Sequence, residues 1–218
     1  MNSPQSDHSQ YLQSLFDTQP TADDLFEKAN QIKDSNPNQK ELHDFLELGH
    51  LTIVNKTISE ANKIDEWFDI IHELILDSKL TVGHLINQRA RYYGNKTCFQ
   101  EIDGNQIRKF TYQDIWDQII QIGQALCAIK SVSGNNITIG IFTENSIRGA
   151  LIDLACLSFH ITIVPIPVTA TPDHLAFIIE NSTITQLFIG GLSVQTILRE
   201  SKIEQKLLDI YHLDDPAE

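Results

Sequence analysis

The feature that most constrains the fold is an alternation of apolar, strand-like runs with amphipathic helical runs in the second half of the chain. Three short runs rich in Ile, Val and Phe are typical of strands buried on both faces, at 137–142, 161–168 and 184–189. Between them, residues 146–159 and 171–180 carry apolar side chains at helical spacing, and the connections are short. Consecutive parallel strands joined by helices form right-handed crossovers, so the pattern predicts a parallel-sheet, three-layer α/β core.

The residues on either side of this alternation predict further elements of the same unit. A helix is expected over 82–94 and a longer one over 112–129, each following a threonine suited to helix capping. An Asp-Gly pair separates two alternating runs, 97–103 and 106–110, which is typical of a β-hairpin. A last helix is expected over 194–208, followed by a polar tail.

The first 80 residues have a different character. They hold fifteen Asp and Glu against six Lys, and their apolar residues recur at helical intervals. We expect a disordered tail over 1–9 and an all-helical, acidic extension over 10–78, followed by the α/β unit over 79–218. The expected helices begin after Thr21, at Gln39 and after Ser59. The third should bury one broad apolar stripe formed by Ile64, Trp67, Phe68, Ile71, Leu74 and Ile75.

Composition and charge exclude several classes of function. The chain has 16 Lys and Arg against 29 Asp and Glu, a net charge of −13, which argues against nucleic acid or an anionic membrane surface as the main partner. No run of about 18 apolar residues occurs, so we expect no transmembrane segment. Three cysteines cannot all pair and the first residues do not resemble a signal peptide, so a cytoplasmic protein with reduced thiols is expected.

The polar residues form no catalytic or metal-binding motif. The sequence lacks a phosphate-binding glycine loop, a nucleophile elbow and closely spaced His or Cys pairs, so it predicts no catalytic residue and no metal site. Ligands of parallel sheets approach the carboxyl ends of the strands, which makes Asn145 and Thr169 the candidates for substrate binding. Each has a structural alternative, because Asn145 precedes the helix cap Ser146 and Thr169 precedes the cap Thr171.

Five segments in the second half resemble, in the same order, motifs of the AMP-forming acyl-CoA synthetases, a family of adenylating enzymes. The helix that ends in Tyr-Gly-Asn-Lys is similar to the family's opening helix, and Phe-Thr-Tyr-Gln-Asp-Ile is similar to its Leu-Thr-Tyr signature. A strand ending in Asn-Ser, a Val-Pro-x-x-x-Thr-like segment and a helix ending in Glu-Asn-Ser follow. The five segments lie at 85–96, 110–115, 137–146, 150–171 and 174–182.

The resemblance implies the front part of an ATP-dependent ligase that joins a carboxylic acid to AMP, releases pyrophosphate, and then forms a thioester with CoA. ATP, Mg and CoA are implied for the full-length parent, and no cofactor is expected on this chain. The chain stops before the family's Ser/Thr/Gly-rich ATP loop and its C-terminal lysine domain, so no catalytic residue carries over. The sequence of Val164–Thr171 resembles that of the long-chain fatty acid members more than that of other members. A fatty acid is therefore the expected substrate of the parent.

The sequence also departs from the family in ways that leave other functions open. Phe159-His160 stands where the family usually has Gly, and residues 1–80 match no part of it. The chain is therefore either the front part of a fatty acyl-CoA ligase, inactive when isolated, or a non-catalytic docking or regulatory module. An unrelated flavodoxin-like ligand binder is a third reading. In the first case the partner is the remainder of the ligase, and an isolated fragment should tend to self-associate.

Overall fold

A computed structural model describes residues 19–35, 37–49, 52–103, 106–132, 137–203 and 209–214. The chain divides into two compact units, residues 1–80 and 81–218, and each is described by itself. The expected tail over 1–9, and the part of the helical extension before residue 19, lie outside the described residues.

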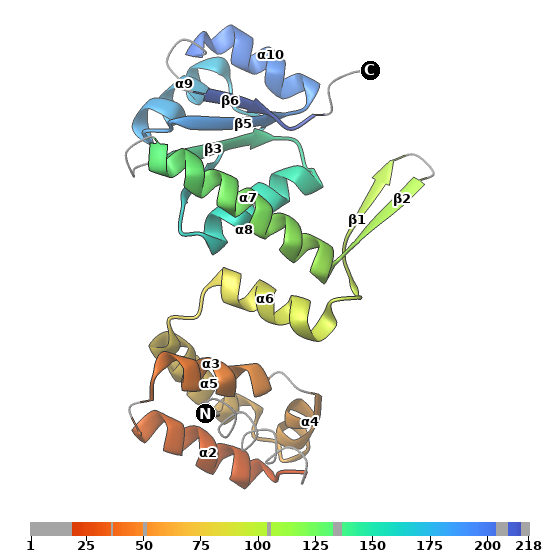
Figure 1. Cartoon of the computed structure of the whole chain (residues 1–218), viewed down its shortest axis with the longest axis vertical. Helices are drawn as coiled ribbons and strands as arrows, with labels where there is room; N and C mark the ends of the chain where they lie inside the picture. Colours follow the sequence, from red (N-terminus) through yellow and green to blue (C-terminus); the bar gives the residue numbers. More distant parts are fainter. Residues whose placement is uncertain are drawn as a thin grey trace, which may run out of the picture. The chain divides into compact units, whose positions relative to one another are not determined.

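The first unit is helical over its described length (Figure 1). Its helices are α2 (Ala22–Asp34), α3 (Gln39–Leu48), α4 (Thr52–Glu60) and α5 (Ile64–Ser78). Helices α2, α3 and α5 occur where the sequence predicts them. Helix α4 was not predicted, because its nine residues include two Thr and an Asn and bury only Val54 and Ile58, which is too weak a pattern to recognise.

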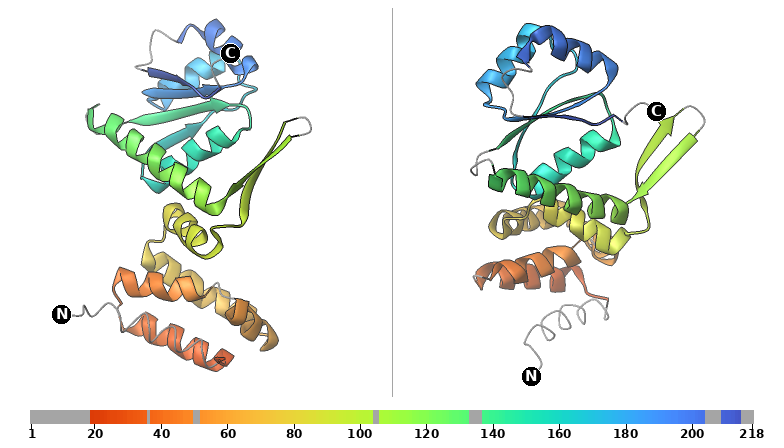
Figure 2. Two further views of the ribbon diagram at one scale, coloured as in Figure 1. Left: turned by 45° about the vertical axis from the view of Figure 1, so that its right-hand side comes forward. Right: turned by 45° about the horizontal axis from the view of Figure 1, so that its top comes forward.

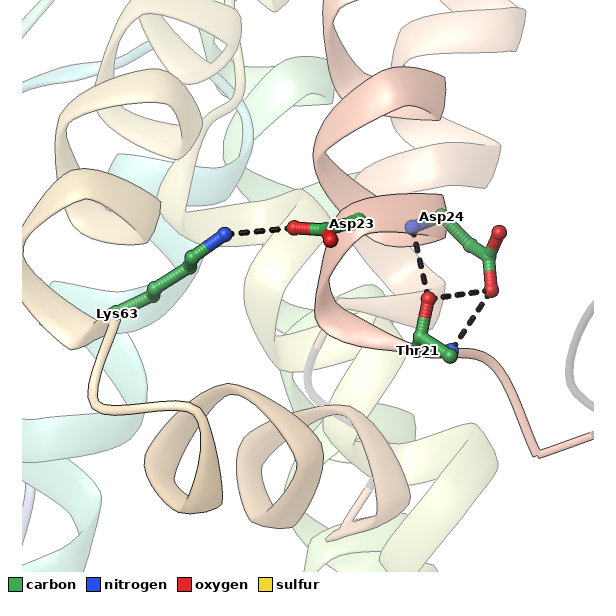
Figure 3. A network of polar contacts seen from close by, with 4 residues as sticks. All are labelled: Thr21, Asp23, Asp24 and Lys63. Carbon is green, nitrogen blue, oxygen red and sulfur yellow. Dashed lines mark hydrogen bonds and ion pairs between the residues drawn. The ribbon is translucent and has the colours of Figure 1, made fainter.

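A reciprocal pair of hydrogen bonds begins α2. The Asp24 amide donates to the Thr21 hydroxyl at 3.2 Å, and the Thr21 amide donates to the Asp24 carboxylate at 2.9 Å (Figure 3). The two bonds form a capping box, and the hydrogen bonds from Thr21 hold the pKa of the Asp24 carboxyl below its usual value. Beside it, the Lys63 ammonium, just before α5, lies 2.6 Å from the Asp23 carboxylate.

Trp67 on α5 lies at the centre of this unit's core. Its ring packs edge-on against Phe26 of α2 and Phe45 of α3, at centroid distances of 5.5 and 6.4 Å. The predicted stripe on α5 was partly wrong. Ile64 and Phe68 are 42% and 66% exposed, and Ile70, which was not predicted, is buried. The buried face centres on Trp67 and Leu74 and is narrower than apolarity alone indicated.

The second unit begins with α6 (Val82–Tyr93), capped by Thr81, and the antiparallel strands β1 (Thr97–Asp103) and β2 (Gln106–Thr111). Helix α7 (Tyr112–Val132) follows, and the Thr111 hydroxyl accepts a hydrogen bond from the Asp114 amide at 3.1 Å. These elements are the helix, hairpin and longer helix that the sequence predicts. The hairpin projects from the rest of the unit (Figure 2).

A four-stranded parallel sheet forms the centre of the second unit. Its order is β4 (Thr162–Pro165), β3 (Thr138–Thr143), β5 (Gln186–Gly190) and β6 (Asp209–His212). Helices α7 and α8 (Ile147–Ser158) cover one face, and α9 (Pro172–Asn181) and α10 (Leu192–Ser201) cover the other (Figure 1). The predicted three-layer α/β core is therefore confirmed.

Two sequence predictions in this unit were wrong in detail. The last helix ends at Ser201 and not at residue 208, since Lys202 adopts a left-handed conformation with φ of 56°, and β6 follows in place of the expected tail. Strand β4 spans four residues and not eight, because Pro165 and Pro167 have no amide hydrogen to donate to a neighbouring strand.

The packing between α7 and the end of α8 depends on a glycine. A Cβ atom on Gly123 would lie 2.1 Å from a ring carbon of Phe159, the residue that follows α8. Only a residue without a side chain lets the Phe159 ring lie this close to α7.

Gln186 at the start of β5 is an exception in an otherwise apolar core. Its side chain is 1% exposed, and neither its amide nitrogen nor its amide oxygen has a hydrogen-bond partner among the described residues. A buried polar group without a partner destabilises the fold, because it loses its hydrogen bonds to water and gains none in the protein.

We expect Gln186→Met to increase the free energy of unfolding of the second unit by about 1–3 kcal/mol, because it keeps the side-chain volume and removes two unsatisfied polar atoms. Urea titration with hydrogen exchange of peptides from β3 and β5 measures this unit alone. The matched control Gln124→Met, at an exposed position of α7, should change stability by less than about 0.5 kcal/mol. A destabilised Gln186→Met protein would show that the amide is satisfied after all.

Candidate functional site

One feature of the second unit that could hold a ligand is a groove at the carboxyl ends of β3 and β4, with a volume of about 740 Å³. We call it the strand-end groove. Four segments form its walls: residues 99–102 of β1, the stretch from the end of β3 into the first turns of α8, Asp153 further along α8, and residues 165–168 at and after the end of β4. It lies where ligands of parallel sheets usually approach.

Local geometry explains why these segments meet. The Ser146 hydroxyl caps α8 by accepting from the Gly149 amide at 3.1 Å, which starts the helix directly after the strand. The Ile166 amide donates to the Ile141 carbonyl at 2.8 Å, so the chain after β4 continues along β3. Residues 165–168 are thereby held beside the end of β3 as one wall of the groove.

The groove is apolar and acidic. Its charged lining residues are Glu101, Glu144 and Asp153, and no Lys, Arg or His lines it among the described residues. Glu101 is paired with Arg108 across the hairpin, and Glu144 accepts a hydrogen bond from the Ser193 hydroxyl. Because the lining supplies no cation to a phosphate, these residues do not fit the triphosphate of ATP.

The structure separates the two residues that the sequence proposed for substrate binding. Asn145 is exposed and lines the strand-end groove. Thr169 is also exposed, but it lies in the turn after Val168, where the Ala170 amide donates to the Pro167 carbonyl at 2.9 Å, and it does not line the groove.

Sequence reasoning missed the wall that β1 contributes. Phe99 and Ile102 belong to a hairpin distant in sequence from β3 and β4, and nothing in their spacing indicates which element they face. Asp153 was also missed, because no motif marks it in the sequence; its place on α8, two turns from the cap, brings it to the groove.

The end of β5 forms a separate polar cluster. Gly191 has φ of 99°, a backbone conformation that residues with a side chain rarely adopt. Its amide donates to both oxygens of Asp214, at 3.0 and 3.2 Å. The Glu144 amide donates to the Gly190 carbonyl at 3.1 Å. The Asp214 carboxylate therefore already occupies the Gly191 amide at the start of α10, where an anion could otherwise bind.

Two further searches cover the described part of the chain. Within it, no three His, Cys, Asp or Glu side chains are grouped closely enough to bind a metal ion. Among the same residues, no helix combines the length and the apolar character needed to cross a membrane.

The parallel sheet with helices on both faces defines an α/β unit, and comparison with known families makes the assignment specific. Residues 86–217 match the family described as AMP-binding enzyme, the adenylate-forming ligase superfamily. The match covers more than half of the chain, which therefore belongs to this family. No curated protein matched the chain.

Solved structures share the fold at low sequence identity. A protein assigned as a long-chain-fatty-acid CoA ligase of Rhodopseudomonas palustris aligns with 64% of this chain at 15% identity and a TM-score of 0.53. Coronafacic acid ligase of Pectobacterium brasiliense covers 63% at 14% identity and a TM-score of 0.53, and a fatty acyl CoA synthetase of Mycobacterium tuberculosis covers 62% at 16% and 0.50. The aligned part is 34%, 26% and 26% of those chains, respectively, so this chain spans about a quarter to a third of their length.

Cys156 on α8 allows a test of the packing behind the groove. It is fully buried, and burial together with the nearby Asp153 carboxylate raises the pKa of its thiol to about 12. Since only the thiolate reacts rapidly, we expect a disulfide reagent at pH 8 to modify Cys156 only after unfolding. The count of modified thiols should be the same for native wild type and native Cys156→Ala, and should differ by one in denaturant. A difference between the native proteins would contradict this packing.

Proposed function

We propose that this chain forms the N-terminal subdomain of an ATP-dependent, AMP-forming ligase that activates a fatty acid. The reaction converts the acid and ATP to acyl-AMP and pyrophosphate, and then transfers the acyl group to CoA with release of AMP. The observation that carries the proposal is the family match over residues 86–217, which spans the parallel-sheet core. A fatty acid as the substrate is supported by the sequence of Val164–Thr171 and by the names of two similar structures.

The lining of the strand-end groove supports a role in which this chain forms only part of the adenylating site. Adenylation needs cations and donors placed around the phosphates, where charge develops in the transition state. The strand-end groove offers carboxylates in their place, so this chain would need residues supplied by further sequence to hold ATP. Its apolar walls, which include Phe99, Ile102 and Val168, instead suit contact with another part of the enzyme.

We therefore propose the remainder of the ligase as the partner of this surface. Ile102 and Ile107 are cross-strand neighbours in the hairpin and are 70% and 58% exposed. Within the described residues, β1 and β2 pair only with each other, so each has a free edge. Exposed apolar side chains beside free strand edges are features of a surface that a partner covers.

A docking or regulatory module remains the second candidate. It is favoured by the same acidic lining of the groove, which suits a polypeptide surface better than a nucleotide. The two functions differ in whether a longer polypeptide containing this chain carries out adenylation.

The activity prediction is tested with acid-dependent release of pyrophosphate from ATP. The chain of 218 residues should release none above background, and the polypeptide obtained by extending the reading frame beyond codon 218 should do so with medium- or long-chain fatty acids. The assay compares acetate, aromatic acids, amino acids and fatty acids of rising length, and a melting curve verifies that each protein is folded. Activity on amino acids alone would move the protein to the peptide-adenylating branch. A folded, extended protein that is inactive on every acid would favour the docking module.

The partner proposal predicts that the isolated chain self-associates through the hairpin, because Ile102 and Ile107 are exposed among the described residues. Sedimentation velocity at rising concentration should show dimers or larger species, and Ile102→Ser with Ile107→Ser should shift the protein towards monomer. Phe177→Ser, at a 59% exposed position of α9, is the matched control and should not change association. A monomeric wild type, or an equal effect of the control, would contradict the role of the hairpin.

A further inference from the structure

Helix α5 of the first unit has a second apolar face, beside the face that is buried around Trp67. Four residues recur at intervals of four and therefore form one ridge along the helix: Ile64, Phe68, His72 and Leu76. Phe68 and Leu76 are each 66% exposed, and Ile64 is 42% exposed. We call these four residues the apolar ridge. Single exposed apolar side chains are common on protein surfaces, whereas a row of them along one helix is a feature of a surface that a partner covers.

A second ridge, made of carboxylates, runs beside the first. Each of its members follows a member of the apolar ridge in sequence: Asp65, Asp69, Glu73 and Asp77. Glu73 pairs with Lys33 of α2, so part of this charge is balanced within the unit. Asp65 and Asp69 are exposed, and neither forms an ion pair with any residue that the structure describes. The amino half of this acidic ridge therefore keeps its negative charge.

Helix α5 itself needs only part of this charge. Asp65 and Glu66 lie in the first turn, where carboxylates stabilise the amino end of a helix. Asp69 lies in the second turn, beyond the reach of most of this effect. The basic side chains of the segment lie elsewhere, since His72 is at mid-helix and Lys79 follows the last residue of α5. Asp69 in particular is free to meet a cation from outside the chain.

The charge of the first unit determines which kind of partner fits this face. The first 80 residues hold fifteen Asp and Glu against six Lys. Four of these lysines, Lys33, Lys40, Lys56 and Lys63, already pair with carboxylates of the unit. A second copy of the chain would bring carboxylates against carboxylates at this face, and an anionic membrane would also repel it. A basic polypeptide is complementary to it.

We propose that α5 is a docking surface for a basic, amphipathic helix of another protein. The apolar side chains of the partner pack on the apolar ridge, and its Lys or Arg side chains pair with Asp65 and Asp69. In such docking the apolar anchors recur every three or four residues, and the flanking charges set orientation and specificity. The surface lies outside residues 86–217, which match the AMP-binding family. A failure of the pyrophosphate assay would therefore leave this inference standing.

A synthetic peptide serves as the probe. It has about 18 residues, enough to lie along the 15 residues of α5, with Leu at helical spacing on one side and Lys on both flanks. Fluorescence anisotropy of the labelled peptide, titrated with the full 218-residue chain, should show saturable binding with a micromolar Kd that weakens as salt rises. Two matched peptides, with Ser in place of Leu or Glu in place of Lys, should each bind about tenfold more weakly or less.

Substitutions of exposed side chains identify the face. Phe68→Ser with Leu76→Ser should weaken binding about tenfold, because the peptide loses its apolar contacts. Phe177→Ser, at a 59% exposed position of α9, is the matched control and should leave the Kd unchanged. A charge exchange, Asp65→Lys with Asp69→Lys, should reject the Lys peptide and accept the Glu peptide, although the chain as a whole stays acidic.

Melting curves verify that each variant is folded, and the charge exchange decides alone if the serine variant is not. Absence of saturable binding to the wild type would overturn the proposal. So would equal effects of Phe68→Ser and Phe177→Ser, or equal binding of the Leu and Ser peptides, which would reduce the interaction to net charge. Ile102→Ser with Ile107→Ser should keep the wild-type Kd, and a loss of binding there would move the peptide to the hairpin.

Two further measurements test the other possible occupants of the face. If Phe68→Ser with Leu76→Ser abolishes self-association of the chain without peptide, in sedimentation velocity, a second copy covers the face and the proposal is wrong. If phosphatidylcholine vesicles compete with the peptide, the face binds lipid and the proposal is also wrong. Unchanged self-association and no competition by vesicles are the expected results.

Discussion

The second unit depends on one strand that is buried on both faces. In β3, Ile139 and Ile141 pack towards α7 and α8, and Phe142 packs towards α9 and α10, so a single strand joins both apolar clusters. It is also the strand that pairs with both β4 and β5. The carboxyl end of β3 supplies one wall of the strand-end groove, and residues 165–168 at and after the end of the neighbouring strand β4 supply another.

How much the sequence reveals depends on how locally each element is determined. Capping residues such as Thr21, Thr81 and Thr171 make their hydrogen bonds within three residues, and the helices that they begin occur as predicted. Strand β6 was missed because its pattern is short and includes Asp209 and His212, and only pairing with β5 makes it a strand. The groove was half predicted for the same reason: Asn145 follows from the strand order, whereas Phe99 and Ile102 reach it through tertiary packing.

Acidic and basic residues of the second unit lie in different parts of it. The strand-end groove presents carboxylates and apolar side chains, whereas residues 81–100 contain two Arg and one Lys and no Asp or Glu. The similar structures share the fold with this chain at about 15% identity, so they do not predict this distribution of charge.

The parallel sheet also has a consequence for the order in which the chain folds. Neighbouring parallel strands are far apart in sequence, and the hydrogen bond from the Thr138 amide to the Thr185 hydroxyl spans 47 residues. Helices with local contacts form faster than sheets that must first close long loops, and domains synthesised first fold first. The helical unit should thus be complete while β3, with apolar side chains on both faces, still awaits β5. During that interval the high negative charge of the chain opposes aggregation, because chains of like charge repel one another.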